Sequence, residues 1–350
     1  MTILPRTFLA TLAALGLLYG GLATAQSGEW KALMQEATAL FFKGKFADGI
    51  VVAKKALDLA EQERGPRHPM VAASLNRLAE LYRLDGQYAA AEPLYQRSLE
   101  IRERTRGANS PEVAQSLNNL AHLYSMQGRR ADAETTFRRA LAIREGALGE
   151  AHPGVGTTLN GLAELYREEG KLAEAEPLYQ RALAIWDKVL VPGTAPPPGA
   201  INQAAFTLNG LAYLSRERKQ YEAAEAYYKR AIAIVEDSRD RDHPLMSRSL
   251  QGLAALYAQQ EKYAAAEILF KRAIAILEDS LDRDHPRMAA VLQGLAGVYA
   301  SREQYGAAEA LLKRALDIRA RALGESHPDV AATRQRIADI QASAARKKPD

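Results

Sequence analysis

A side-chain amide recurs at a regular interval along most of the chain. It occupies six positions, 42 residues apart except for one interval of 49: Asn76, Asn118, Asn160, Asn209, Gln251 and Gln293. An amide offers two donors and an acceptor, so a row of them suits the backbone of an extended peptide. The same side chains could instead cap or bridge neighbouring helices of the fold, and the sequence leaves both interpretations open.

Charged and polar residues accompany the amides at helical spacing. With the six amides they complete the predicted peptide-binding groove: Glu80, Arg83, His122, Glu164, Arg167 and Arg216. Counting Glu168 and Glu217, the stretch around the first four amides holds three arginines against four glutamates. This near-neutral mixture favours a mixed polar segment as the ligand over an acidic tail.

The histidines have another spacing, which points to structure and not to a metal. Five of the six stand directly before a proline, at positions 68, 152, 243, 285 and 327. Ser110 takes the same place in one further repeat, and serine is a common helix cap. The stretches at 240–243 and 282–285 contain Asp and His, but their spacing is unlike a zinc helix or a calcium loop. We therefore expect caps here, and neither a metal nor a cofactor.

Composition excludes several other classes of function. The 350 residues include no cysteine, which removes disulfides and thiol catalysis. Lysine and arginine number 46 against 42 acidic residues, a net charge of +4, and no basic patch suggests a nucleic-acid partner. Neither a phosphate-binding glycine loop nor a nucleophile elbow can be found, so we predict that the protein is not an enzyme.

The elements that carry these residues are helices in a repeat. Pro69, Pro111 and Pro153 are 42 residues apart, and a second such series starts at Pro244. Within a repeat, apolar residues recur at i, i+3, i+4 and i+7, as in Leu75, Leu78, Ala79 and Tyr82, which predicts an amphipathic helix. A glycine turn and a second apolar stripe follow. One helical hairpin cannot bury both of its apolar faces alone, so the sequence predicts an all-α solenoid of seven stacked hairpins.

The repeat resembles the tetratricopeptide repeat in its 42-residue, kinesin light chain-like form. The resemblance rests on three segments of one repeat: His68-Pro69, Leu75-Asn76-Arg77-Leu78-Ala79 and Ala91-Glu92-Pro93-Leu94-Tyr95. It implies a right-handed superhelix whose concave groove, lined by the first helix of each hairpin, holds peptide ligands. The asparagines of such a groove contact the ligand backbone, which implies the same role for the amides here.

The two ends of the chain depart from the repeat. Residues 1–25 have one early arginine, an apolar run over 8–22 and an Ala-x-Ala end, as a secretory signal peptide cleaved after Ala25 would. An uncleaved anchor is the alternative. The solenoid is expected over 26–345, with a proline-rich insertion at 191–199 and a capping helix at 328–345, where Arg334 and Gln341 replace apolar residues of the stripe. Residues 346–350 are expected to form a flexible tail.

These features predict an exported interaction scaffold, periplasmic or secreted, that binds a protein or peptide segment in its groove. No stable membrane insertion is expected after cleavage of the signal peptide. The alternative is a structural envelope protein whose groove is filled by its own chain or by a sister subunit, which makes a homo-oligomer a second possible assembly.

Overall fold

The computed structural model describes residues 28–41, 43–191, 193–197, 199–237, 244–280 and 286–347. Over these ranges the chain is helical with turns between the helices and contains no strand, which confirms the predicted all-α class. The predicted signal peptide and two of the histidine turns lie outside the described residues. The chain divides into two compact units, residues 1–150 and 151–350, which are described separately below.

The N-terminal unit is a stack of helical hairpins. A helix over residues 28–41 comes first, and the following helices are α2 (Phe46–Arg64), α3 (Pro69–Leu84), α4 (Tyr88–Arg106), α5 (Pro111–Met126) and α6 (Arg130–Leu148). Helices α3 and α4 pack against each other, as do α5 and α6, and α4 also packs on α5. Trp30 ties the first helix to this stack, because its indole N–H donates to Ser74 Oγ at 2.9 Å.

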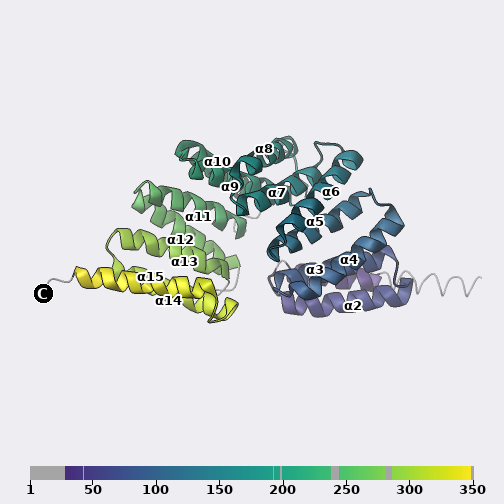
Figure 1. The fold of residues 1–350 in the computed structure, drawn as a ribbon, viewed down its shortest axis with the longest axis horizontal. Coiled ribbons are helices and arrows are strands. Elements are labelled where there is room, and N and C mark those ends of the chain that lie inside the picture. The colour runs from purple at the N-terminus through teal and green to yellow at the C-terminus, as the bar shows by residue number, and fades with distance from the viewer. Residues whose placement is uncertain are drawn as a thin grey trace, which may run out of the picture. The chain divides into compact units, whose positions relative to one another are not determined.

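The C-terminal unit is also built of helical hairpins (Figure 1). Its helices are α7 (Pro153–Glu168), α8 (Leu172–Val189), α9 (Ala200–Glu217), α10 (Tyr221–Glu236), α11 (Pro244–Gln259), α12 (Tyr263–Ser280), α13 (Pro286–Ser301), α14 (Tyr305–Leu323) and α15 (Pro328–Arg346). Each odd-numbered helix up to α13 pairs with the helix that follows it. Below, α3, α5, α7, α9, α11 and α13 are called the first helices, since each opens a hairpin.

Helices α3, α5, α7 and α15 each begin at a proline with a side-chain cap before it. His68 Nδ1 accepts from the backbone N–H of Met70 at 3.2 Å, and His152 and His327 make the equivalent bond at 3.0 and 3.1 Å. Ser110 Oγ takes the backbone N–H of Val113 at 3.3 Å. Each bond satisfies a donor that the first turn of a helix leaves free, and proline removes another. The predicted capping role is confirmed for these four residues.

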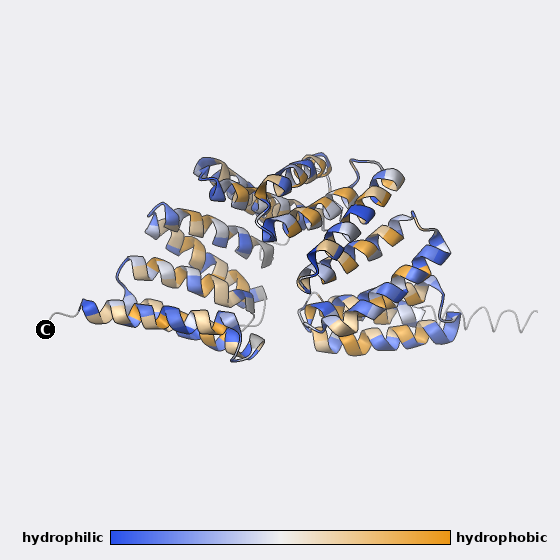
Figure 2. Cartoon of the chain, in the orientation of Figure 1, coloured by the Kyte–Doolittle hydropathy of each residue, from blue (hydrophilic) through white to orange (hydrophobic). Residues whose placement is uncertain are grey.

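The core of each unit is the apolar stripe predicted from the sequence. Leu75, Leu117, Leu159, Leu208 and Leu250 share one register and are all at most 3% exposed. Apolar and polar residues alternate along the helices throughout the described ranges (Figure 2). Each helix is therefore amphipathic, and none of the described helices combines the length and apolarity needed to cross a bilayer.

Three glycines allow a close approach between successive hairpins of the C-terminal unit. A Cβ atom built on Gly210 would lie 2.5 Å from Cζ of Tyr179, and one on Gly252 would lie 2.3 Å from Cε1 of Tyr228. Gly294 has the same relation to Phe270 at 2.5 Å. At these positions the aromatic ring of one hairpin therefore lies directly against the backbone of the next first helix.

The end of the chain has the pattern expected of a capping helix. In α15, Val330 is fully buried and Ile337 is 9% exposed, whereas Arg334 and Gln341 are exposed. The helix runs through Arg346, one residue beyond the expected boundary. In the insertion, Thr194 Oγ1 donates to the carbonyl of Val191 at 2.7 Å, and α9 then starts at Ala200. A single continuous solenoid over 26–345 stays a prediction.

Candidate functional site

The predicted groove residues lie on the first helices of both units. Asn76, Glu80 and Arg83 lie on α3, and Asn118 and His122 on α5. In the C-terminal unit α7 carries Asn160, Glu164 and Arg167, α9 carries Asn209 and Arg216, and Gln251 and Gln293 follow on α11 and α13. The common register places each amide one residue after the buried leucine of the stripe. Successive residues on a helix are 100° apart, so the amides lie at the edge of the packed face.

The four asparagines are therefore more buried than their polarity suggests. Their exposed fractions are 9% for Asn76, 5% for Asn118, 2% for Asn160 and 5% for Asn209. Buried amides are normally hydrogen-bonded, and the partners of these four divide them into two pairs.

Two asparagines bridge neighbouring first helices. Asn76 Oδ1 accepts from Nδ2 of Asn119 at 3.0 Å, which links α3 to α5. Asn160 links α7 to α9 more extensively: its Nδ2 donates to the carbonyl and to Oε1 of Gln203 at 3.1 and 3.0 Å. Its Oδ1 accepts from Thr207 Oγ1 at 2.7 Å. The structural interpretation of the amide row is supported at these two positions, where the amide is already used by the fold.

The other two asparagines have polar atoms without a partner among the described residues. Oδ1 of Asn118 is buried and unbonded, and in Asn209 both Oδ1 and Nδ2 are. Such atoms cost free energy unless water or a ligand satisfies them. The ligand-binding interpretation is open at these two positions. The glutamines differ again, because Gln293 Oε1 accepts from Arg319 at 2.6 Å whereas Gln251 lines a pocket.

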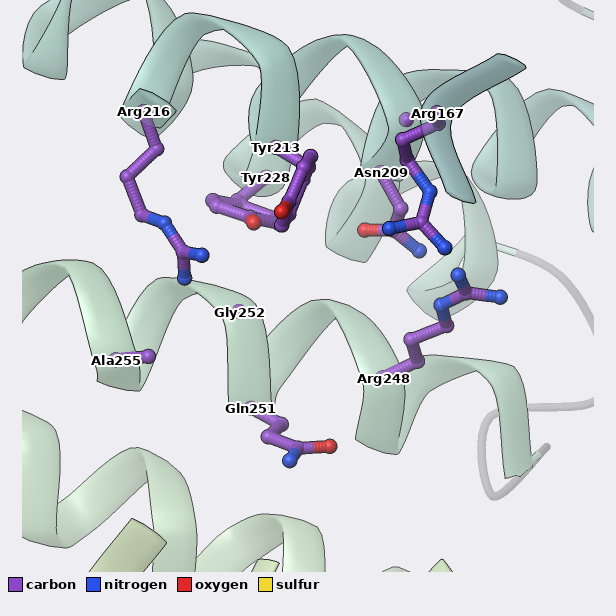
Figure 3. Close-up of a pocket in the computed structure, with 10 residues that line it drawn as sticks. Arg167, Asn209, Tyr213, Arg216, Tyr228, Arg248, Gln251, Gly252 and Ala255 are labelled. Atoms are coloured by element: carbon purple, nitrogen blue, oxygen red, sulfur yellow. The ribbon is translucent and has the colours of Figure 1, made fainter. Parts of the chain in front are cut away.

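The pocket lies in the C-terminal unit and has a volume of about 190 Å³. Its walls come from α7, α9, α10 and α11, and the lining residues are Arg167, Asn209, Gly210, Tyr213, Arg216, Tyr228, Arg248, Gln251, Gly252 and Ala255. Figure 3 shows the guanidinium groups of Arg167 and Arg248 on the side of Asn209, with Arg216 on the other side of the two tyrosines. Four residues of the predicted groove thus meet in one cavity.

Glu164 is not a lining residue, but it pairs with two of the arginines that line this pocket. Arg167 donates to both of its carboxylate oxygens, at 2.7 and 2.8 Å, and Tyr179 Oη donates at 2.7 Å. Arg248 approaches from α11 at 3.2 Å. Burial would raise the pKa of Glu164, but the bonds from Arg167 and the charges of Arg248 and Arg167 outweigh it and lower the pKa to about 2. The carboxylate is therefore charged throughout the neutral range.

Aromatic rings hold the arginines in place. The guanidinium groups of Arg167 and Arg216 lie 4.9 and 5.1 Å from the ring centroid of Tyr213, and Arg248 lies 5.0 Å from that of Phe206. Guanidinium groups stack favourably on aromatic faces at such distances. The three cations are consequently positioned by packing as well as by ion pairs.

The predicted residues of the N-terminal unit form smaller local contacts. Glu80 pairs with Arg77 on the same helix at 2.8 Å, and Arg83 approaches the Sδ atom of Met126 at 3.2 Å. The ring of His122 packs edge-on against Phe137, with centroids 4.9 Å apart. Glu80 and His122 occupy the register of Glu164, but no comparable pocket is described around them.

Six lining residues lie outside the predicted groove set, and three of them have polar side chains: Tyr213, Tyr228 and Arg248. Tyr213 stands at the register of Glu80, His122 and Glu164, so a comparison of equivalent positions would have included it. Arg248 precedes Gln251 by three residues, at a position that faces the same surface. Tyr228 lies on a second helix and enters the pocket only because Gly252 lets it approach. No group of three or more His, Asp and Glu suited to a metal occurs within the described ranges.

Comparisons with known proteins agree with this architecture. A family model of the tetratricopeptide repeat matches residues 31–104, 71–146, 112–188 and 203–279, and a second model of that description matches 288–329. Together they cover well over half of the chain. A search of curated proteins found no match.

Several solved structures are similar to this chain. BtubC (BKLC) from P. vanneervenii is 24% identical over 67% of this chain and 91% of its own, with a TM-score of 0.55. TPR-like repeats of a kinesin light chain from Podosopora anserina are 24% identical over 61% and 97%, with a TM-score of 0.48. The Rap conjugation gene regulator of the plasmid pLS20, solved in complex with the Phr* peptide, is 18% identical over 83% and 75%, with a TM-score of 0.60.

Proposed function

Because the chain belongs to the tetratricopeptide repeat family, we propose that it is a non-catalytic scaffold that binds an extended polypeptide segment along its first helices. Hairpin stacks of this kind present a long surface made by successive first helices, which suits an extended ligand. The Rap regulator, a similar fold, was solved with a peptide, and this supports a peptide as the class of partner.

One observation carries the proposal: the buried amide of Asn209 has no partner for either polar atom. The equivalent amide of Asn160 makes three bonds within the fold, so the register does not by itself leave an amide unbonded. Asn209 also lines the pocket on α9. A peptide backbone supplies the donor and acceptor that this amide lacks.

The alternative, a groove filled by a second copy of the chain, predicts a different assembly. A self-associating protein would show at least twice the chain mass by light scattering at micromolar concentration. The scaffold proposal predicts a monomer that binds peptides selected from a random library of linear 12-residue sequences.

The amides provide the matched test. Asn209→Ala removes no hydrogen bond within the described residues, so we expect little change in the free energy of unfolding and a loss of peptide affinity of about 1–2 kcal/mol. Asn118→Ala asks the same question in the N-terminal unit. Asn160→Ala is the control, because it removes three bonds and should cost about 1–3 kcal/mol of stability. If Asn209→Ala destabilises the fold as much as Asn160→Ala and keeps its peptide, the amide is structural and the proposal fails.

Export belongs to the same proposal. The apolar run at 8–22 and the Ala-x-Ala end support a cleaved signal peptide and a periplasmic or secreted protein. Mass spectrometry of the native protein should find an N-terminus at Gln26. An intact Met1 in the purified protein would contradict export by cleavage.

A further inference from the structure

Met126, the last residue of α5, combines an exposed side chain with an arginine donor at its sulfur. We propose that Met126 is a site of reversible oxidation to methionine sulfoxide, and that the sulfoxide oxygen accepts a hydrogen bond from Arg83 and ties α5 to α3. The inference goes beyond the proposed function, because it requires neither a bound peptide nor export. It gives the chain a response to peroxide.

Exposure distinguishes Met126 from the other methionines of the described ranges. Met126 is 46% exposed, whereas Met246 and Met288 are fully buried. Met34 and Met70 lie between these extremes. The chain has no cysteine, so methionine carries all of its oxidisable sulfur. Since susceptibility to oxidation follows exposure, an oxidant in solution reaches the thioether of Met126 first.

The oxidation needs a two-electron oxidant, for which hydrogen peroxide is sufficient. A lone pair of the sulfur attacks one peroxide oxygen, and the O–O bond breaks as the S–O bond forms. The departing hydroxide takes the proton from the transferred oxygen and becomes water. The sulfur loses two electrons and the peroxide gains them. Sulfoxide reductases reverse the change with two thiols as the reductant, which become a disulfide while the oxygen leaves as water.

Arg83 supplies the donor for the new oxygen. Its Nη1 lies 3.2 Å from the Sδ of Met126. A thioether is a weak acceptor, whereas a polar oxygen forms a stronger, charge-assisted bond with a guanidinium group. Glu80, three residues before Arg83, pairs with Arg77, and no carboxylate of the described residues pairs with Arg83. The guanidinium group is therefore available to a better acceptor on α5.

The repeat itself supports an oxygen acceptor at this position. From α7 to α13, every residue at the register of Met126 carries a side-chain oxygen: Glu168, Glu217, Gln259 and Ser301. Leu84 stands at this register on α3, at the other end of the series. Met126 thus places an apolar side chain where the following first helices have a polar one. Oxidation adds the oxygen that the later repeats already have.

The first experiment measures the rate of oxidation at each methionine. The full chain is treated with hydrogen peroxide under native conditions, and sulfoxide is quantified in digested samples by mass spectrometry. Met126 should be oxidised roughly 10-fold or more faster than Met246. Met246 is the matched control, because Arg272 donates to its sulfur at 3.5 Å although the residue is fully buried. Both sulfoxide epimers of Met126 should be reduced by the reductases MsrA and MsrB with dithiothreitol.

The second experiment tests the bond to Arg83 without relying on selective oxidation. Met126→Gln places a side-chain oxygen at this position, and Met126→Leu is its apolar reference. Changing the reference to the Gln variant should raise the folding equilibrium constant roughly 3- to 10-fold more with Arg83 present than in an Arg83→Ala background. Urea unfolding measures all four proteins. Oxidised and reduced wild type, compared with oxidised and reduced Arg83→Ala, should give a ratio of the same sign.

The outcomes decide the inference separately from the proposed function. Equal rates at Met126 and Met246, or a sulfoxide that the two reductases do not remove, overturn the oxidation site. Rapid oxidation with no dependence of the Gln or sulfoxide effect on Arg83 overturns the link between α5 and α3. None of these results bears on peptide binding, because no peptide is present in either experiment.

Discussion

Helix α7 carries Glu164 and Arg167 at the two positions where α11 carries Ala255 and Ala258. The second helix of each hairpin also differs. Tyr179 on α8 donates a hydrogen bond to Glu164, whereas the equivalent residue on α12 is Phe270, which has no hydroxyl group. Both hairpins nevertheless fold alike and bury the same leucine stripe.

The difference shows which residues the fold requires. Since hairpin α11–α12 forms without a carboxylate, a guanidinium or a phenol at these positions, the polar network of α7–α8 is not a requirement of the helical hairpin. A buried ion pair is weak evidence for stability, because the desolvation of both charges offsets their attraction. The network is better explained by its effect on the pocket, where Glu164 holds the lining residues Arg167 and Arg248 in place.

The largest expected effect tests the part that both regions share. Leu159→Ala on α7 and Leu250→Ala on α11 each open a cavity at a fully buried position, so each should lower the free energy of unfolding by about 2–5 kcal/mol. Urea unfolding followed by circular dichroism measures both. If the losses in free energy of unfolding of the two variants differ by more than about 3 kcal/mol, the two hairpins do not have equivalent cores.

The glycine contacts test how the aromatic rings reach the surface. Gly210→Ala and Gly252→Ala place a methyl group within 2.5 Å of a tyrosine ring, and we expect each to destabilise the protein by about 1–3 kcal/mol. Gly297→Ala is the control, because its Cβ would have nothing within 4 Å. In an open helical position alanine should stabilise by about 0.5–1 kcal/mol. Equal effects at all three sites would contradict the close approach.

The pH dependence of stability at Glu164 tests the polar network of α7–α8, which hairpin α11–α12 lacks. Its pKa is about 2 in the folded protein against 4.5 for an unperturbed glutamate, so its contribution is present above pH 4.5 and lost as the pH falls toward 2. Glu164→Gln should remove about 3 kcal/mol of stability at neutral pH. The gap between variant and wild type, measured in urea at several pH values, should close over that window. A gap that is independent of pH would contradict the ionised network.

The smallest effect concerns the turns within the hairpins. Gly170 takes a φ of 74° between α7 and α8, and Lys219 and Glu261 adopt φ of 60° and 61° at the equivalent turns. A side chain is strained in this left-handed region and glycine is not. Lys219→Gly and Glu261→Gly should each stabilise by about 0.5–1 kcal/mol, whereas Gly170→Ala should destabilise by about 1 kcal/mol. Thermal unfolding of the three variants tests the opposite signs.

The fold could be predicted almost entirely from the sequence, because its signals are local and repeated. Proline with a preceding histidine or serine marks the start of a helix, and the leucine stripe defines the buried face at Leu75 and Leu159. These features depend on a few neighbouring residues, so a prediction made for one repeat applies to the others.

The candidate site was only partly predictable, because it depends on contacts between hairpins. The register of the amides is visible in the sequence, but whether an amide is hydrogen-bonded within the fold depends on its neighbours. Gln203 and Thr207 form hydrogen bonds with Asn160, whereas no described residue forms one with the side chain of Asn209. Tyr228 enters the pocket from a second helix through the space at Gly252. These partners lie 24 to 47 residues apart along the chain, and spacing alone does not pair them.

The most direct test of the binding surface is hydrogen exchange of the full chain, with and without a saturating selected peptide, followed by mass spectrometry. The account predicts slower exchange in segments from α7, α9 and α11, and no change in α14 and α15. Protection confined to α14 and α15, or absent from α7 and α9 at saturation, would contradict the assignment of the ligand to the arginine-lined surface.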